Sequence, residues 1–433
     1  MDQAPRHAAH PPRLYRRHRG GAGGAVTGID RRTLLAASAA APAAARAGVA
    51  PDVWDAIVVG AGVFGAWTAE RLRAAGQRVL LLDAWGPAHA RASSGGESRM
   101  TRSDYGPDEI YSRLAHESLG DWIALSARAG LPLFHRAGVL FLFQQDEAYA
   151  RDSIAVHQRL GLRLDVLDRA ALGRRWPQIA SDDITLGLHE PDFGALMARR
   201  AVQTLVDGFV RAGGSFRRAL VQPPADTPTF DAITLADGER LRARRFVFAA
   251  GPWLPKLFPA LLGDRIFPTR QEVFFFAPPA GDDRFGPARL PGWADWNGGN
   301  IVYGFPDLEN RGFKIAEDGH GPAIDPDGGD RTASPARIAF AHAYLARRFP
   351  ALASAPLVES RVCQYENSAN GDFLIDTHPA WPNAVLLGGG SGHGFKHGPA
   401  VGRLAAALAL AGTPAPARFS LASKGRNQAR AVH

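Results

Sequence analysis

The stretch that decides the fold reads Asp55-Ala-Ile-Val-Val-Gly60-Ala-Gly62-Val-Phe-Gly65, then the Ala- and Leu-containing segment 66–75, then Arg78-Val-Leu-Leu-Leu-Asp83. The two apolar runs predict buried strands, and the segment between them predicts a helix. A GxGxxG spacing alone is weak, but here it lies between a strand and a helix, and an acidic residue ends the next strand. The stretch therefore predicts the first βαβ unit of a dinucleotide-binding domain.

The glycines and the acidic residue of this motif each serve a separate physical purpose. Gly60 permits the tight turn, Gly62 lets a pyrophosphate approach the backbone, and Gly65 lets the helix pack closely on the strand. The helix N-terminus then faces the phosphates, and Asp83 can bind ribose hydroxyls. The motif by itself does not distinguish a nicotinamide cofactor from a flavin.

The composition is that of a folded enzyme with an unusual leader. The chain has 433 residues, of which 46% are hydrophobic and 21% charged, a size that suits two domains or one elaborate domain. Residues 1–50 contain eight arginines and two acidic residues, so they carry six of the eight net positive charges. We therefore expect no nucleic-acid partner, because that would need basic side chains clustered on a folded surface. The single cysteine, Cys363, excludes an internal disulfide and a multi-thiolate metal site, and no metal is expected.

Residues 1–50 are typical of a twin-arginine export signal. Arg31-Arg32 precede Thr33-Leu-Leu, an Ala-rich run at 36–45 and small residues suited to cleavage. The apolar run is shorter than the roughly 20 residues that span a bilayer, so stable membrane insertion is not expected. The leader predicts passage through the export machinery to the periplasm or the extracellular space. The alternative is a cytoplasmic protein with a basic tail or a misassigned start.

A second glycine-rich loop lies near the C-terminal end. The apolar run at 384–387 predicts a buried strand, the loop 388–394 follows it, and a helix is predicted from about Pro399 to Leu410. Such a loop places backbone N–H groups and a positive helix end where an anion can bind. A ring that becomes anionic on reduction would be stabilised there.

Four motifs occur in one order along the chain: Ser98-Arg99-x-x-Arg102-x-x-Tyr105-Gly106; Tyr303-Gly-Phe-Pro with Lys314 beyond it; Cys363-x-Tyr365 followed by Asp376-x-His378-Pro379; and Gly390-Ser-Gly392-His393-Gly394-Phe395-Lys396. With them, the sequence from about Asp52 to Ser420 resembles the monomeric sarcosine oxidase family of the D-amino-acid-oxidase-like flavoproteins. The resemblance implies an α/β fold with a Rossmann-like (glutathione-reductase-like) FAD-binding domain and a second α+β substrate domain on a mixed or antiparallel sheet. We expect the FAD-binding domain to comprise 52–131, 193–264 and 364–420, and the substrate domain 132–192 and 265–363.

The resemblance also assigns roles around the cofactor. It implies that FAD is covalently attached through Cys363, although a lone cysteine by itself would equally suit a small buried apolar position. Arg99 would lie against the flavin, and Lys314 beside the ring edge would promote the reaction with oxygen. The cofactor-binding set is completed by residues of the last motif, namely Gly392, His393, Gly394 and Lys396.

The same resemblance implies a substrate site and a reaction. Arg102 and Lys396 would clamp a substrate carboxylate, and Tyr303 and Tyr365 complete the catalytic set. N-methyl or cyclic secondary amino acids would lose a hydride to the flavin, the resulting imine would be hydrolysed, and oxygen would be reduced to hydrogen peroxide. The alternatives are a dehydrogenase that uses another electron acceptor and a non-catalytic flavin-binding protein.

Several positions depart from the family pattern or allow another interpretation. Asp318 stands where the family often has histidine, and we expect it to belong to loop surface with Glu317 and His320. If Asp318 faced the substrate instead, its carboxylate would favour a cationic or bulkier substrate. Glu366 replaces the usual small hydroxyl residue after Cys-x-Tyr. The segment His189–Asp192 is expected to be a turn. His393 and His397 have the i, i+4 spacing of metal ligands, but Pro399 predicts that the helix starts after them.

Overall fold

The stretch from Asp55 to Asp83 folds as the predicted βαβ unit in the computed structural model. β1 (Val53–Val59), α1 (Val63–Ala74) and β2 (Val79–Asp83) follow one another, and the two strands pair in parallel. Gly60 has a φ of +106°, and a Cβ at this position would lie 2.2 Å from the carbonyl oxygen of Ala249. A Cβ on Gly65 would lie 1.9 Å from the carbonyl oxygen of Gly60, whereas Gly62 has room for one. Gly60 and Gly65 are thus required by packing, and Gly62 leaves the loop backbone accessible.

The structure describes residues 53–145, 147–297 and 300–428. The leader with Arg31 and Arg32 lies outside these residues. Among the helices that are described, none combines the length and the apolar character needed to cross a bilayer.

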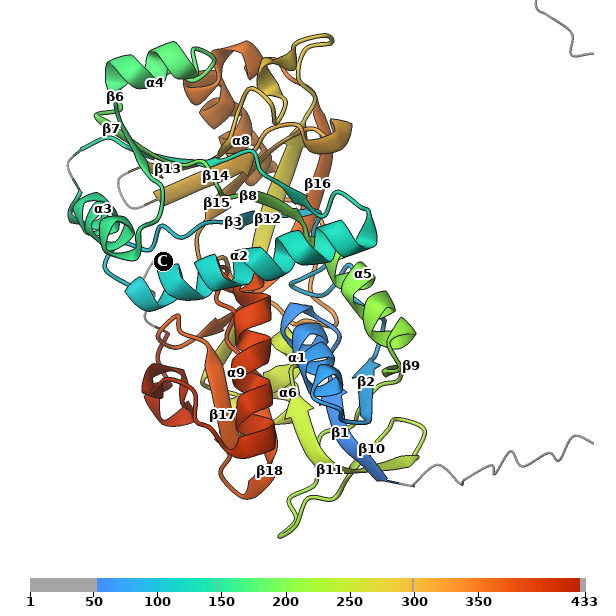
Figure 1. The fold of residues 1–433 in the computed structure, drawn as a ribbon. Helices are drawn as coiled ribbons and strands as arrows, with labels where there is room; N and C mark the ends of the chain where they lie inside the picture. The colour runs from blue at the N-terminus through green and yellow to red at the C-terminus, as the bar shows by residue number, and fades with distance from the viewer. Residues whose placement is uncertain (1–52, 146, 298–299, 429–433) are drawn as a thin grey trace, which may run out of the picture. The chain divides into compact units, whose positions relative to one another are not determined.

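The first sheet contains seven strands in the order β17-β18-β11-β1-β2-β9, with β10 paired to β11. β18, β11, β1, β2 and β9 run parallel, and their apolar side chains are buried on both faces. α1 packs against α9 and α5 on one face (Figure 1). The remaining bounds are β9 (Ser215–Arg218), β10 (Ala232–Thr234), β11 (Arg240–Phe248), β17 (Leu374–His378), β18 (Trp381–Gly388), α5 (Ala198–Arg211) and α9 (Gly398–Ala411). The predicted strand at 384–387 and the predicted C-terminal helix are confirmed.

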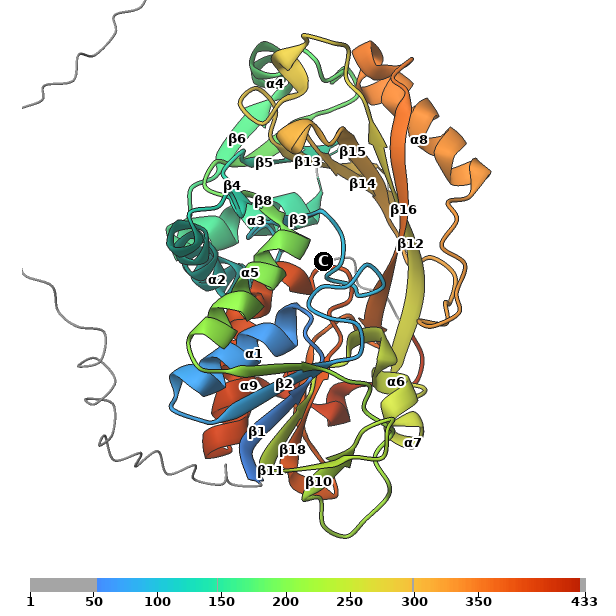
Figure 2. The same cartoon turned by 90° about the vertical axis from the view of Figure 1, so that its right-hand side faces the viewer.

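The second sheet is mixed and has the order β16-β12-β15-β14-β13-β5-β7-β6. Only β5 and β13 pair in parallel; the other pairs are antiparallel. The bounds are β5 (Val139–Phe143), β6 (Asp165–Asp168), β7 (Leu186–Glu190), β12 (Ile266–Phe276), β13 (Gly292–Asn297), β14 (Asn300–Phe305), β15 (Phe313–Asp318) and β16 (Leu357–Ser368). In Figure 2 the long strands β12 and β16 extend from this sheet toward α6 (Leu254–Leu257) and α7 (Pro259–Leu262) of the first. The predicted fold class is confirmed, and the domain boundaries stay a prediction.

A small third sheet and four further helices complete the described fold. β8 (Gly194–Met197) lies between β3 (Ser98–Thr101) and β4 (Phe134–His135), and β3 carries Arg99. The helices are α2 (Glu109–Ala129), α3 (Ala148–Leu160), α4 (Arg169–Arg175) and α8 (Pro335–Arg348).

The predicted turn at His189–Asp192 is wrong for its first half. His189 and Glu190 belong to β7, which pairs with β5 and β6, and both side chains are buried. These cross-strand contacts, which the local sequence does not display, outweigh the turn preference of Pro191 and Asp192.

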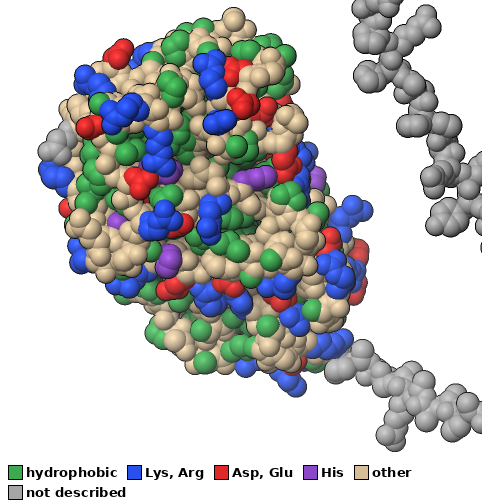
Figure 3. All heavy atoms as spheres, turned by 45° about the horizontal axis from the view of Figure 1, so that its top comes forward, with side chains coloured by type: hydrophobic (Ala, Val, Ile, Leu, Met, Phe, Trp, Pro, Cys, Tyr) green, Lys and Arg blue, Asp and Glu red, His purple; other side chains and the backbone are tan. Residues whose placement is uncertain are grey.

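Charges of both signs alternate over the face of the molecule drawn in Figure 3. Many charged side chains of the described chain form close ion pairs, such as Arg113 with Glu109 and Arg200 with Glu309, each at 2.6 Å.

Candidate active site

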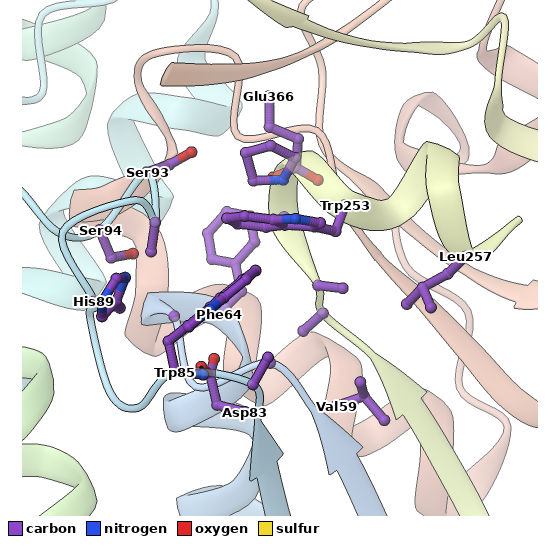
Figure 4. Close-up of a pocket in the computed structure, with 18 of the residues that line it drawn as sticks. Val59, Phe64, Asp83, Trp85, His89, Ser93, Ser94, Trp253, Leu257 and Glu366 are labelled. Atoms are coloured by element: carbon purple, nitrogen blue, oxygen red, sulfur yellow. Dashed lines mark hydrogen bonds between the residues drawn. The ribbon is translucent and has the colours of Figure 1, made fainter. Parts of the chain in front are cut away.

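A cavity of about 600 Å³ connects the two glycine-rich loops of the first sheet. Gly60, Gly62 and Asp83 line it at the β1 loop, and Gly390, Gly392 and Gly394 line it at the loop that follows β18. Figure 4 shows the side chains that form its walls, including Phe64, Trp85, His89, Ser94, Trp253 and Glu366. A cavity at the carboxyl ends of parallel strands is where a dinucleotide binds in this type of sheet.

Asp83 binds the backbone around the first glycine-rich loop. Its Oδ2 accepts a hydrogen bond from the N–H of Ala61 (2.8 Å), and its Oδ1 accepts from the N–H groups of Trp85 (2.9 Å) and Gly86 (2.8 Å). The N–H of Val63, at the start of α1, donates to Ser94 Oγ (3.0 Å). The carboxylate expected to bind ribose therefore also fixes the loop expected to bind the phosphates.

Two smaller cavities adjoin this one and contain the residues expected to perform the chemistry. The second, of about 420 Å³, is lined by Cys363 and Lys314, and the third, of about 70 Å³, by Arg102, His393 and Lys396. Tyr303 lines the second and third, whereas Arg99 and Tyr365 line all three. Every residue predicted for the site lines one of these cavities, except Gly65, which packs beneath the loop.

Lys314 lies on β15 and is only 2% exposed. Its Nζ donates to the carbonyl oxygen of Ser98 (3.1 Å) and lies 5.1 Å from the centre of the Phe305 ring. Burial, together with the nearby guanidinium of Arg99, lowers the pKa of Lys314 to about 7. The ammonium can therefore lose its proton near neutral pH.

Cys363 lies on β16 beside Arg99. Its Sγ is 3.5 Å from Nη2 of Arg99, which also donates to the carbonyl oxygen of Ser93 (2.5 Å). The thiol is free, half-buried and part of a cavity wall, so it is not a filler of the hydrophobic core.

The third cavity has two buried cations, because Arg102 is 8% exposed and Lys396 is 4% exposed. Both lie over the ring of Tyr105, at 4.0 Å for the guanidinium carbon and 5.0 Å for Nζ. Lys396 Nζ donates to the carbonyl oxygen of His393 (2.8 Å), and burial and the charge of Arg102 hold the pKa of Lys396 well below its ordinary value. Two cations of different shape in a cavity of this kind suit a carboxylate ligand.

A buried polar network lies behind Arg102. The Arg102 guanidinium donates to the carbonyl oxygen of Asp104, and Glu190 Oε1 accepts from the N–H of Ser103 (2.8 Å). Glu190 also lies 3.1 Å from His157 Nε2. Burial opposes a charge on His157, but the hydrogen bond with Glu190 raises its pKa to about 9. The sequence did not predict this network, because the turn expected at 189–192 placed Glu190 outside a buried strand.

Asp318 faces the third cavity, so the expectation that it belongs to loop surface is wrong. It ends β15, is half-buried, and accepts a hydrogen bond from the hydroxyl of Tyr365 (3.2 Å). Burial and the Asp318 carboxylate raise the pKa of Tyr303 to about 12, so this phenol keeps its proton. The neighbouring Glu317 instead pairs with Arg337.

His393 and His397 meet at the hydroxyl of Tyr105. The distances are 3.2 Å from His393 Nδ1 and 2.7 Å from His397 Nε2, and the two ring centres are 5.9 Å apart. His397 precedes α9, as Pro399 predicts, yet the short 3-10 turn Gly394–His397 brings the rings together. Within the described ranges, no group of three or more His, Cys, Asp or Glu side chains could hold a metal.

Trp85, Trp253 and Glu366 are among the side chains of the large cavity to which the sequence alone assigned no role. The two indole rings contact each other with centres 4.8 Å apart. Both tryptophans closely follow strands of the first sheet, β2 and β11. Position after a parallel strand was therefore the signal that could have identified them.

Known proteins share this fold. The fold and the connected cavities define an FAD-dependent oxidoreductase. The chain belongs to the DAO family of FAD-dependent oxidoreductases, which its residues 55–408 match. The resemblance inferred from the four motifs is confirmed at this level, together with FAD as the cofactor.

Relatives are similar over nearly their whole length. N-methyl-L-tryptophan oxidase from Salmonella arizonae is 33% identical over 368 residues, which cover 83% of this chain and 96% of the relative. The Citrobacter koseri enzyme of the same name is 32% identical over 370 residues, covering 84% and 96%. Among solved structures, L-proline dehydrogenase from P. horikoshii has a TM-score of 0.75 at 19% identity, covering 86% of this chain and 97% of that one. Fructosyl peptide oxidase from E. terrenum has a TM-score of 0.73 at 21% identity, covering 86% and 92%.

Proposed function

We propose that this enzyme oxidises the secondary amine of an N-methyl or cyclic amino acid and passes the electrons to oxygen. The observation that carries the proposal is the pair of buried cations, Arg102 and Lys396, in a small cavity that shares Arg99 and Tyr365 with the large cavity. The names of the relatives support the substrate class. Bound FAD would supply the acceptor for a hydride from the carbon next to the amine nitrogen, and oxygen would then take up the two electrons with two protons and become hydrogen peroxide.

The residues of the third cavity perform distinct tasks. Arg102 and Lys396 bind the substrate carboxylate and so fix which carbon lies toward the junction of the cavities. Their positive charge lowers the pKa of the substrate amine, which must be neutral before hydride loss. Asp318 offers a carboxylate on the same wall, which favours a substrate that carries a hydrogen-bond donor or a cation beyond the reacting amine.

A substrate panel scored for flavin bleaching and for peroxide tests this function. N-methyl and cyclic amino acids should bleach the flavin under nitrogen and yield peroxide in air, whereas matched primary amino acids should react poorly. An amine that lacks only the carboxylate is the control for the clamp. Bleaching without peroxide would indicate a dehydrogenase, and no bleaching by any amine would indicate a non-catalytic flavin-binding protein; either result contradicts the proposal.

We also propose that the FAD is covalently attached through Cys363. Its free thiol lies in the cavity wall beside Arg99, and no other cysteine exists in the chain. The wild-type protein should stay yellow after acid precipitation, whereas Cys363→Ala should release its flavin into the supernatant. Ser93→Ala, which changes a side chain of the adjoining large cavity, is the control and should keep the colour. A colourless wild-type pellet would exclude attachment.

For localisation, we propose export to the periplasm or the extracellular space by the twin-arginine route. The support is the sequence of residues 1–50, with Arg31-Arg32 ahead of an Ala-rich run. Replacing both of these arginines by lysine should retain the protein in the cytoplasm. The same change at Arg16-Arg17, the other arginine pair of the leader, is a matched control and should leave export intact. Equal distribution of the two variants would contradict the proposal.

A further inference from the structure

Glu366 presents a carboxyl group to the large cavity. It lies near the end of β16, is 6% exposed, and its side chain projects toward the cavity near Trp253 (Figure 4). A carboxyl in this position is unexpected, because the same cavity fits a cofactor that carries two negatively charged phosphates.

The second glycine-rich loop is built around this side chain. Glu366 Oε1 accepts a hydrogen bond from the N–H of Gly389 (3.0 Å), and the backbone oxygen of Glu366 accepts from the N–H of Ser391 (2.9 Å). A Cβ on Gly388 would lie 2.1 Å from Oε1, so the carboxyl packs directly against this glycine. The loop predicted to bind an anion thus uses two of its N–H groups on Glu366 itself, one on the side chain and one on the backbone.

No basic side chain of the described residues forms an ion pair with Glu366, in contrast to the many paired surface carboxylates. Lys256, from α6, is bound to Asp325 (2.7 Å) and Asp327 (2.5 Å). The residue opposite Glu366 on β12 is Pro268, and His393 of the loop hydrogen-bonds Tyr105 and the carbonyl oxygen of Gly371. Arg99 and His89 also line this cavity, but their hydrogen-bond partners lie elsewhere: Arg99 donates to the carbonyl oxygens of Ser98 (2.8 Å) and Ser93 (2.5 Å), and His89 Nδ1 accepts from the N–H of Arg91 (3.3 Å). The acidic and phenolic groups of the cavity, Asp83, Asp327 and Tyr365, provide no positive charge.

This environment favours the neutral form of the carboxyl. Burial raises the pKa of Glu366 to about 8, although the N–H groups of Gly389 and Gly390 oppose the rise. An ionised carboxylate would also repel the phosphates, whereas a protonated one can donate a hydrogen bond. Oε1 already accepts from Gly389, and Oε2 lies on the side of Gly251, which lines the cavity.

We propose that Glu366 is a cofactor-binding residue that stays protonated and donates a hydrogen bond to an oxygen of the bound FAD. Binding of FAD is then coupled to retention of one proton. The inference uses the family's cofactor and is independent of which amine the enzyme oxidises.

The test measures the Kd for FAD against pH in the Cys363→Ala background, where the flavin is not tethered. With Glu366 present, FAD should bind about tenfold more weakly at pH 9 than at pH 7, because the ionised carboxyl must regain its proton. Adding Glu366→Gln should remove this tenfold change in Kd, because the glutamine amide has the same shape, stays neutral and can still donate a hydrogen bond. Contributions from Lys314 and Lys396 are common to both proteins and cancel in the comparison.

Glu359→Gln is the matched control, since Glu359 lies on the same strand outside the cavity, and it should follow the profile of the parent. Parallel pH profiles for the parent and the Glu366→Gln variant would overturn the proposal. Tighter binding at pH 9, or a Gln variant that binds more weakly at every pH with an unchanged slope, would also overturn it, since both indicate an ionised acceptor.

Thermal unfolding gives a second readout that does not require exchangeable FAD. A carboxyl whose folded pKa is raised must hold a proton in the native state, so it destabilises the fold as pH rises from the unfolded pKa, about 4.3, to about 8. The Tm of Glu366→Gln relative to wild type should therefore increase over this interval and level off only above it. A Tm difference independent of pH would overturn the proposal.

Discussion

Replacing Lys314 by methionine is expected to slow the reaction of the reduced enzyme with oxygen by about 100-fold or more, with a much smaller effect on reduction by substrate. Lys314 Nζ is a buried cation in the cavity that also contains Cys363, where it would stabilise negative charge developing on oxygen. Methionine keeps the length and apolar character of the side chain while removing the charge. Stopped-flow absorbance of each half-reaction measures the two rates separately.

The pH dependence of the same reaction has a defined sign. The pKa of Lys314 is lowered to about 7, so the ammonium fraction falls as pH rises through that value. Oxygen reactivity of the wild type should decrease over the same interval, and that of the methionine variant should be flat. Lys256→Met, which removes a lysine from a surface pair with Asp325 and Asp327, should behave as wild type. Equal slowing of both half-reactions by Lys314→Met would indicate a structural role instead.

Lys396→Met is expected to lower kcat/KM for a secondary amino acid by about 100- to 1,000-fold, because it removes one half of a buried carboxylate clamp. Arg102→Lys should have a smaller effect, since it keeps the charge and loses only the bidentate fork. The decisive comparison uses a substrate pair that differs only in the carboxylate. The decrease in kcat/KM caused by Lys396→Met should largely disappear for the amine that lacks the carboxylate.

The stability of the Lys396→Met protein provides the control. Burial disfavours the ammonium of Lys396, so the variant should unfold at the same or a higher temperature than wild type. Equal losses of kcat/KM for the two substrates would contradict a role in binding the carboxylate and indicate a disturbed cavity.

Local sequence was sufficient where the pattern repeats within a few residues. The apolar runs around Gly60 and before Asp83, and the run at 384–387, each carry their own signal for strand formation. The glycine spacing fixed the role of the first loop for the same reason. Resemblance then supplied the residues that gather around the cavities, which are far apart in the chain.

Residues whose place depends on distant partners were mispredicted or missed. Glu190 looks like part of a turn beside Pro191, but His157 and Ser103 hold it in a buried strand. Asp318 looks like loop surface, but it lies against the hydroxyl of Tyr365, 47 residues away. Glu366 was noticed as a departure, yet only the fold shows that the loop around Gly389 wraps it. None of these tertiary contacts has a local signature.

Arg99 and Tyr365 line all three cavities, and this sharing links events in one cavity to events in the others. A ligand that fixes these two side chains in one cavity reduces the conformational entropy that a ligand in the next must give up. By reciprocity, each ligand then raises the affinity for the other by the same factor. We therefore expect the substrate to bind more tightly once the cofactor has ordered these two side chains.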